Sequence, residues 1–132
     1  MKMIVMLVFI YSFIFVSCAA QTVTKIKVCY VDIEAETPIS VNCENFELLF
    51  NSRIKTDIII NKDDIDAIYF DLNNLQIYTT EYSPDIRAKI IIGDSINYNE
   101  YCISSWFSHI FYKHTAYIIN SRLKGVIKKY IK

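Results

Sequence analysis

Apolar and polar residues follow strand or helix periodicities along most of the chain beyond residue 24. The clearest strand pattern covers residues 85–92, where the two types alternate. Because successive side chains of a strand point to opposite faces, one face would carry Ile86, Ala88, Ile90 and Ile92, and the other Asp85, Arg87, Lys89 and Ile91. We expect the first face to be buried and the second to be partly exposed, as antiparallel sheets allow. On that basis Lys89→Ala would cost under ~1 kcal/mol of stability.

Further segments have strand character. Residues 25–33 alternate at first and then become apolar on both faces, and strands are also predicted at 97–107 and, after a turn around Lys113 and His114, at 111–120. Shorter extended segments are indicated at 39–43, 56–60 and 77–78.

Three segments have helical spacing. The first begins near Asn42 and carries Phe46, Leu49, Phe50 and Ile54 on one side. The second follows a cap at Asp63 and carries Ile65, Ile68, Tyr69, Leu72 and Leu75. The third follows a cap at Asn120 and carries Leu123, Val126, Ile127, Tyr130 and Ile131. These elements predict a single α+β domain over residues 25–132, with an antiparallel sheet of about four strands and about three helices packed mainly on one face.

The start of the chain has the form of an export signal. A basic residue at Lys2 precedes a mostly apolar run over residues 3–16, and small residues follow at 17–20. The run is shorter than the ~20 apolar residues that a membrane-spanning helix needs. We therefore expect residues 1–17 to be a signal peptide and residues 18–24 to be a tether.

Phe15-Val16-Ser17-Cys18 resembles a bacterial lipobox, the motif that precedes a lipidated cysteine. The resemblance implies that Cys18 becomes the mature N-terminus and carries several acyl chains, which together hold a protein firmly at a membrane. Two alternatives are ordinary cleavage after Ala20, giving a secreted protein, and an uncleaved anchor.

Charge and composition exclude two classes. The chain has 14 basic and 14 acidic residues, so no general electrostatic attraction to nucleic acid is expected. Hydrophobic residues make up 53% of the sequence, enough to offset the entropy of ordering a domain and so to exclude disorder.

The cysteines are Cys18, Cys29, Cys43 and Cys102. If Cys18 is lipidated, the other three allow at most one disulfide, and the favoured pair is Cys43 with Cys102. Its loop of about 60 residues would stabilise the fold by about 4 kcal/mol in the chain-entropy model. The alternative is three buried thiols packed as small hydrophobic groups.

The sequence lacks the residue patterns that several kinds of cofactor and metal site require. Gly93 and Gly125 are too far apart for a phosphate-binding loop, a dinucleotide fingerprint or a nucleophile elbow, so no cofactor is predicted. His109 and His114 do not form a zinc pattern, and the acidic cluster at 63–71 lacks the glycine and glutamate of a calcium loop. The remaining enzyme hypothesis is a small hydrolase using Cys102 and His109, with Asp85 or Asp94 orienting the imidazole.

A binding surface is the favoured hypothesis. Arg87 and Lys89 on the wetter strand face, with Tyr101 and Trp106 nearby, combine residue types that supply binding energy at interfaces. The chain as a whole is similar to the uncharacterised small bacterial lipoproteins, a type rather than a defined family, which transfers no site residues. This resemblance implies a location on the periplasmic side of a membrane rather than at the cell surface. Because the glycine-dependent and metal-dependent chemistries lack their residues, we expect a non-catalytic module, anchored at the membrane through Cys18, that binds a protein or envelope component. The alternatives are the cysteine hydrolase and a plainly secreted structural protein.

Overall fold

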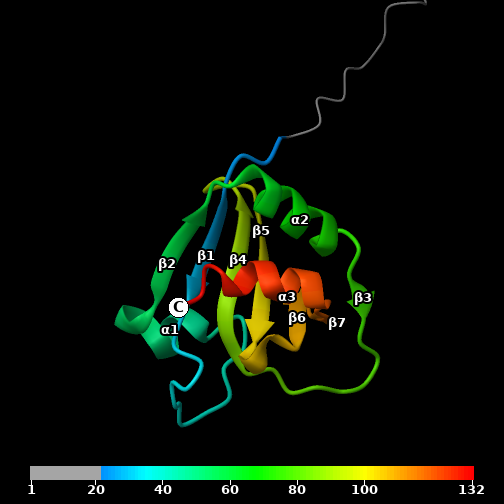
Figure 1. The fold of residues 1–132 in the computed structure, drawn as a ribbon. Helices are drawn as coiled ribbons and strands as arrows, with labels where there is room; N and C mark the ends of the chain where they lie inside the picture. The colour runs from blue at the N-terminus through cyan, green and yellow to red at the C-terminus, as the bar shows by residue number, and fades with distance from the viewer. Residues whose placement is uncertain (1–21) are drawn as a thin grey trace, which may run out of the picture.

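In the computed structural model, which describes residues 22–132, one antiparallel sheet runs through the protein (Figure 1). Its strands are ordered β2-β1-β4-β5-β6-β7-β3, and every neighbouring pair is antiparallel. The strand bounds are Ile26–Tyr30 (β1), Lys55–Ile59 (β2), Gln76–Ile77 (β3), Ile86–Gly93 (β4), Tyr98–Ser104 (β5), His109–Tyr112 (β6) and Thr115–Ile118 (β7).

The two longest strands, β4 and β5, form a hairpin at the centre of the sheet. Asp94 begins its turn, and the carboxylate accepts hydrogen bonds from the backbone N–H of Ile96 (2.8 Å) and of Asn97 (2.6 Å). These bonds lower the pKa of Asp94, because they stabilise the charged form. Gly93 has φ of 130°, and a Cβ there would lie 2.2 Å from the carbonyl oxygen of Asn97, so only glycine fits.

The helices are α1 (Phe46–Phe50), α2 (Lys62–Leu72) and α3 (Ser121–Lys128), with single 3₁₀ turns η1 (Asn51–Arg53) and η2 (Ser105–Phe107). Asn120 caps α3 as predicted, since its side chain accepts a hydrogen bond from the Leu123 N–H. The cap of α2 is Asn61, which accepts from the Asp64 N–H, and the predicted cap at Asp63 is wrong by two residues.

Helices α2 and α3 cover one face of the sheet, and α3 crosses in front of the strands in Figure 1. The larger core lies between the sheet and these two helices. It includes Ile26, Val28, Ile90, Ile103, Ile68, Leu72, Leu123 and Ile127. The two helices are also joined by ion pairs: Arg122 Nε donates to Asp71 (3.0 Å), and Lys129 pairs with Asp64 (2.9 Å).

A smaller core lies on the opposite face of the sheet. Phe46 and Phe50 of α1 are buried there, with their ring centroids 5.3 Å apart, against Val31, Val41, Ile86 and Cys102. The helix therefore rests on the sheet through two aromatic rings one turn apart, as its apolar stripe predicted. Together with the connection between β1 and α1, it covers part of this face.

The predicted sheet of about four strands is wrong, because the described residues form seven. Beyond the predicted strands, the sheet includes β2, with five residues, and β3, with two, and the single strand predicted at 111–120 is replaced by β6 and β7, with four residues each. Segments of this length gain their structure from pairing with a neighbour more than from their own alternation. The helices also lie on both faces, with α1 opposite α2 and α3.

The face assignment within β4 needs one correction. Ala88, Ile90 and Ile92 face the larger core as predicted, but Ile86 faces the smaller core with α1. The register against β5 shifts between Ile86 and Ala88, and such a bulge reverses the face of the residues beyond it.

The predicted signal peptide at 1–17, the lipidation site at Cys18 and the first part of the tether lie outside the described residues. Thr22, Val23 and Thr24, which complete the tether, lead into β1 without regular structure.

Candidate functional site

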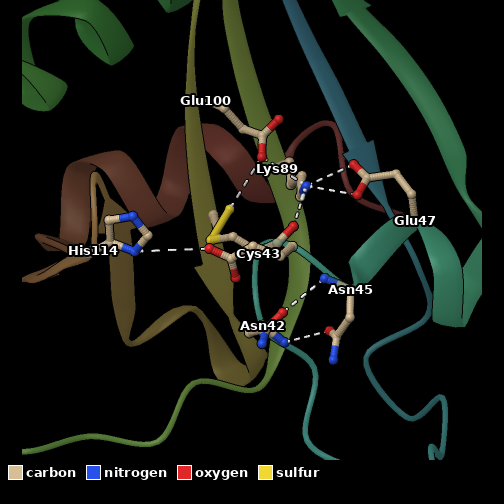
Figure 2. Close-up of a disulfide and its surroundings, with 9 residues drawn as sticks. Asn42, Cys43, Asn45, Glu47, Lys89, Glu100 and His114 are labelled. Carbon is tan, nitrogen blue, oxygen red and sulfur yellow. Dashed lines mark hydrogen bonds and ion pairs between the residues drawn. A yellow bond between two sulfur atoms is a disulfide. The ribbon is translucent and has the colours of Figure 1, made fainter.

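A buried lysine organises the face of the sheet that carries α1. Lys89 is 2% exposed, and its ammonium group is surrounded by oxygen atoms (Figure 2). It donates to the carbonyl oxygen of Cys43 (2.7 Å) and to the carboxylate of Glu47 (2.7 and 3.0 Å), and it lies 2.8 Å from Glu100. Three acceptor groups thus match the three N–H donors of an ammonium group.

Each partner comes from a different element. Glu100 lies on β5, whose Cys102 is directly opposite Lys89 in the ladder. Glu47 is in the first turn of α1, and the Cys43 carbonyl belongs to the turn before that helix. The turn is closed by Asn42 and Asn45, each of which accepts a 2.8 Å hydrogen bond from the other's backbone N–H (Figure 2).

A disulfide joins the same turn to the sheet. Cys43 is bonded to Cys102, with Cα atoms 5.8 Å apart, so the favoured cysteine pair is the one that the structure brings together. Cys29 has no disulfide partner among the described residues, and its half-buried thiol lies 3.8 Å from the hydroxyl of Thr56. The disulfide and the lysine both hold the turn before α1 against β4 and β5, which leaves the two glutamates in fixed positions.

Two hollows lie on this face, and Glu100 lines both. The first, which we call the Glu47–Glu100 pocket, has a volume of about 680 Å³. Its walls also include the apolar side chains of Ile58, Ile91 and Tyr98, with Lys25 and Lys27 among the lining residues. The second has a volume of about 390 Å³ and contains Cys102, Tyr82, Phe111 and His114.

At the Glu47–Glu100 pocket, the carboxylates can bind a ligand but the buried ammonium group cannot. The donors of Lys89 are all engaged, whereas each carboxylate accepts hydrogen bonds through two oxygens that have several lone-pair positions. The side chains of Glu47 and Glu100 are 58% and 30% exposed, so both remain accessible to a ligand. The pocket therefore offers acceptors beside an apolar wall.

The predicted interaction surface of Arg87, Lys89, Tyr101 and Trp106 does not exist as one surface. Arg87 is 8% exposed, pairs with Asp85 at 2.7 Å and lies over the ring of Phe50, and its Nε has no hydrogen-bond partner among residues 22–132. Tyr101 is buried in the larger core on the other face, stacked on Tyr112, and burial raises its pKa.

Trp106 is the exception, being 73% exposed in η2 with φ of 63°. The prediction failed because α1 and the connection before it cover the polar face of β4. A strand pattern cannot show such a cover.

The predicted pairing of Cys102 with His109 is also absent. Cys102 has no free thiol, since its sulfur is in the disulfide. The His109 ring lies 2.8 Å from the Ser108 hydroxyl and packs against the rings of Tyr78 and Tyr82, and burial lowers its pKa. His114 lies 3.9 Å from Glu44, with both side chains largely exposed.

Glu47 and Glu100 were missed by the sequence reasoning. The signal for Glu100 was its place on a predicted strand, two residues before Cys102 and so on the same face. Glu47 lies four residues after Cys43, but its helix is brought to the sheet by the disulfide and by the packing of Phe46 and Phe50, which are contacts between distant segments.

Within residues 22–132, no group of three or more His, Cys, Asp or Glu side chains is placed to hold a metal ion. Every helix in the same range is too short or too polar to cross a bilayer. Comparison with protein-family models, curated proteins and solved structures finds no significant match.

Proposed function

We propose that this chain is an exported, lipid-anchored, non-catalytic binding protein that holds a basic segment of a protein partner in the Glu47–Glu100 pocket. The observation that carries the proposal is the buried Lys89 with its two glutamates, fixed next to an open apolar wall. A site held in its binding geometry before the ligand arrives loses less entropy on binding.

The chemistry of the pocket favours a Lys or Arg side chain. The cationic head would bind the carboxylates of Glu47 and Glu100 at lone pairs that Lys89 does not use, and the methylene stem would lie on Ile58 and Ile91. Lys25 and Lys27 also line this pocket and disfavour a densely basic ligand. A partner segment of mixed charge therefore fits best.

The disulfide supports export. Disulfides persist in oxidising compartments such as the periplasm and are rare in the reducing cytosol. The Cys43–Cys102 bond thus agrees with the signal peptide predicted at 1–17 and with a lipid on Cys18. A protein held at a membrane by lipid is well placed to retain a partner there.

Site-specific photo-crosslinking in the native host cell tests the binding site. A photoreactive amino acid at Ile58, 44% exposed in the pocket wall, should give a covalent protein adduct. The matched control is Ile118, which is 40% exposed on β7 and lies outside both pockets. Glu100→Gln should remove the adduct while leaving the disulfide intact in a thiol gel-shift assay.

Two results would contradict the binding proposal. One is the absence of an adduct from position 58 in folded, disulfide-bonded protein. The other is an adduct that persists at full yield with Glu100→Gln, because the carboxylate would then have no part in recognition.

The lipid anchor is tested separately by metabolic labelling with a fatty-acid analogue. Cys18→Ser should abolish labelling and shift the protein out of the membrane fraction. Cys29→Ser, which removes the free thiol of the described residues, should leave both unchanged. Equal labelling of the Cys18→Ser variant and the parent would refute the proposed lipid anchor on Cys18.

A further inference from the structure

Large apolar side chains are exposed at one end of the protein. Ile96, in the turn between β4 and β5, is 84% exposed. Ile60, directly after β2, is 77% exposed, and Tyr69 of α2 is 46% exposed. We call these three residues the anchor-end patch. Single exposed apolar residues are common on proteins, so it is their common location that needs explanation.

The patch surrounds the point at which the described chain begins. Ile26 pairs with Ile59 and Lys27 pairs with Ile91, which sets the start of β1 beside Ile60 and the end of β4. Tyr69 and Ile96 line one hollow of about 580 Å³ together with Val23. Figure 1 shows the start of β1, the β4–β5 turn and the start of α2 at the same end of the molecule.

The distance from the predicted lipid to this end is short. Five residue steps separate Cys18 from Val23, and a fully extended chain spans at most ~3.6 Å per residue, so the two lie within about 18 Å. The polar headgroup region on each side of a bilayer is itself roughly 5 to 8 Å thick. With a lipid on Cys18, a tether of this length would hold this end of the protein close to the membrane surface.

We propose that the anchor-end patch contacts the interfacial region of the bilayer, an inference that rests on the proposed lipid anchor. Isoleucine side chains gain from leaving water, and tyrosine suits the headgroup level because its ring is apolar and its hydroxyl is polar. Charges near the patch are mixed, with Lys25 and Asp94 at the hollow and Lys62 paired with Asp66 at 2.5 Å. The contact is therefore apolar and independent of anionic lipid.

This orientation sets where the partner binds. Tyr98 lines both the hollow at the patch and the Glu47–Glu100 pocket, so the pocket opens next to the membrane-facing end. A partner segment in the pocket would lie close to the bilayer surface. The opposite end, with η2 and the connection between β1 and α1, would point away from the membrane.

Tryptophan fluorescence in lipid vesicles tests the orientation. The full chain, lipidated in the host, is reconstituted into phosphatidylcholine vesicles with or without bromine on the acyl chains. Its single tryptophan, Trp106, lies beyond the far end of β5 and is 73% exposed, so the parent reports on the end away from the patch. Ile96→Trp in a Trp106→Phe background moves the reporter into the patch.

We expect emission from position 96 to shift to shorter wavelength and to be lost in brominated vesicles. Emission from Trp106 of the parent should show neither effect. Ile39→Trp in the same background is a positional control, since Ile39 is 57% exposed in the connection between β1 and α1. Adding phosphatidylglycerol to the vesicles should leave the quenching at position 96 unchanged.

Three outcomes would overturn the inference. Equal quenching at positions 96 and 106 would mean that the domain has no fixed orientation. A shift at position 96 without bromine quenching would mean that a second copy of the protein, and not the bilayer, covers the patch. Lipidated protein that stays on the vesicles with an unquenched reporter would refute this contact alone, whereas absence of lipid on Cys18 would refute the anchor as well.

Discussion

Replacing Lys89 by methionine tests the buried ion cluster most directly. The substitution keeps most of the side-chain volume but removes the ammonium group bound to Cys43, Glu47 and Glu100. A charged lysine held at 2% exposure is stable only because its partners compensate for the lost hydration. The folded parent and the folded Lys89→Met variant therefore differ mainly in those three interactions of the ammonium group.

The expected cost follows from the exposure of the partners. Removing one member of a fully buried ion pair costs ~3–5 kcal/mol, because the other charge is left without water or a counter-charge. Here the side chains of Glu47 and Glu100 are 58% and 30% exposed and can bind water instead. Only the Cys43 carbonyl loses a donor outright, so we expect Lys89→Met to cost about 2 kcal/mol.

Alanine at the same position should cost more. It also removes three methylene groups from the smaller core, at ~0.8 kcal/mol each, which adds about 2 kcal/mol to the cost of methionine. Lys27→Ala is the matched control, since Lys27 is an exposed lysine on the adjacent strand, and it should cost under ~1 kcal/mol. If Lys89 were exposed, Lys89→Ala would also be expected to cost under ~1 kcal/mol.

Equilibrium urea unfolding of the full chain, followed by circular dichroism, measures these differences. The midpoints should rank parent and Lys27→Ala highest, then Lys89→Met, then Lys89→Ala, with unchanged slopes. If Lys89→Met were as stable as the parent, the ion cluster would contribute no net stability. If Lys89→Ala matched Lys27→Ala, the burial of Lys89 itself would be refuted.

Three further predictions concern other parts of the fold. Reducing the Cys43–Cys102 disulfide, whose sequence separation is 59, should lower the unfolding free energy by about 4 kcal/mol, and an unchanged urea midpoint after reduction would contradict this. Ile90→Ala, at a fully buried site in the larger core, should cost ~2–5 kcal/mol in the same assay, and a cost below ~1 would mean that β4 presents its other face. Arg122 lowers the pKa of Asp71, so this carboxylate stabilises the fold above its unfolded pKa of ~3.9 and loses that effect as the pH falls through the lowered value. Asp71→Asn should therefore flatten the acid side of the melting-temperature profile, and an unaltered profile would exclude this pair.

Some predictions succeeded because their cause is local. The Asn120 cap and the pair Phe46 and Phe50 of α1 depend on residues three or four apart, and the structure shows both. The predicted start of α1 near Asn42 and its extension to Ile54 are wrong, since the helix covers Phe46–Phe50. The alternation of β4 correctly identified Ile90 and Ile92 as core residues. It failed at Ile86, because the bulge depends on how β5 pairs with β4 and not on β4 itself.

Contacts between distant segments explain the larger errors. The strands that were not counted include β3, whose two residues become a strand only by pairing with β7. The candidate site was misplaced for the same reason, since Lys89 has the pattern of an exposed residue until α1 covers it. Its partner Glu47 is 42 residues away in the sequence, and the residues near each of them give no indication that the two side chains meet.

The sequence by itself determined the secondary structure of the longer segments and the α+β character, and it favoured Cys43 and Cys102 as a pair while leaving three free thiols as the alternative. These features follow from side-chain periodicity, local capping and the count of available thiols. The tertiary structure alone decided which charged residues are buried, which face of the sheet is open, and where the glutamates meet. Burial depends on what packs over a side chain, and for Lys89 the covering helix is brought to the sheet by Phe46, Phe50 and the Cys43–Cys102 disulfide.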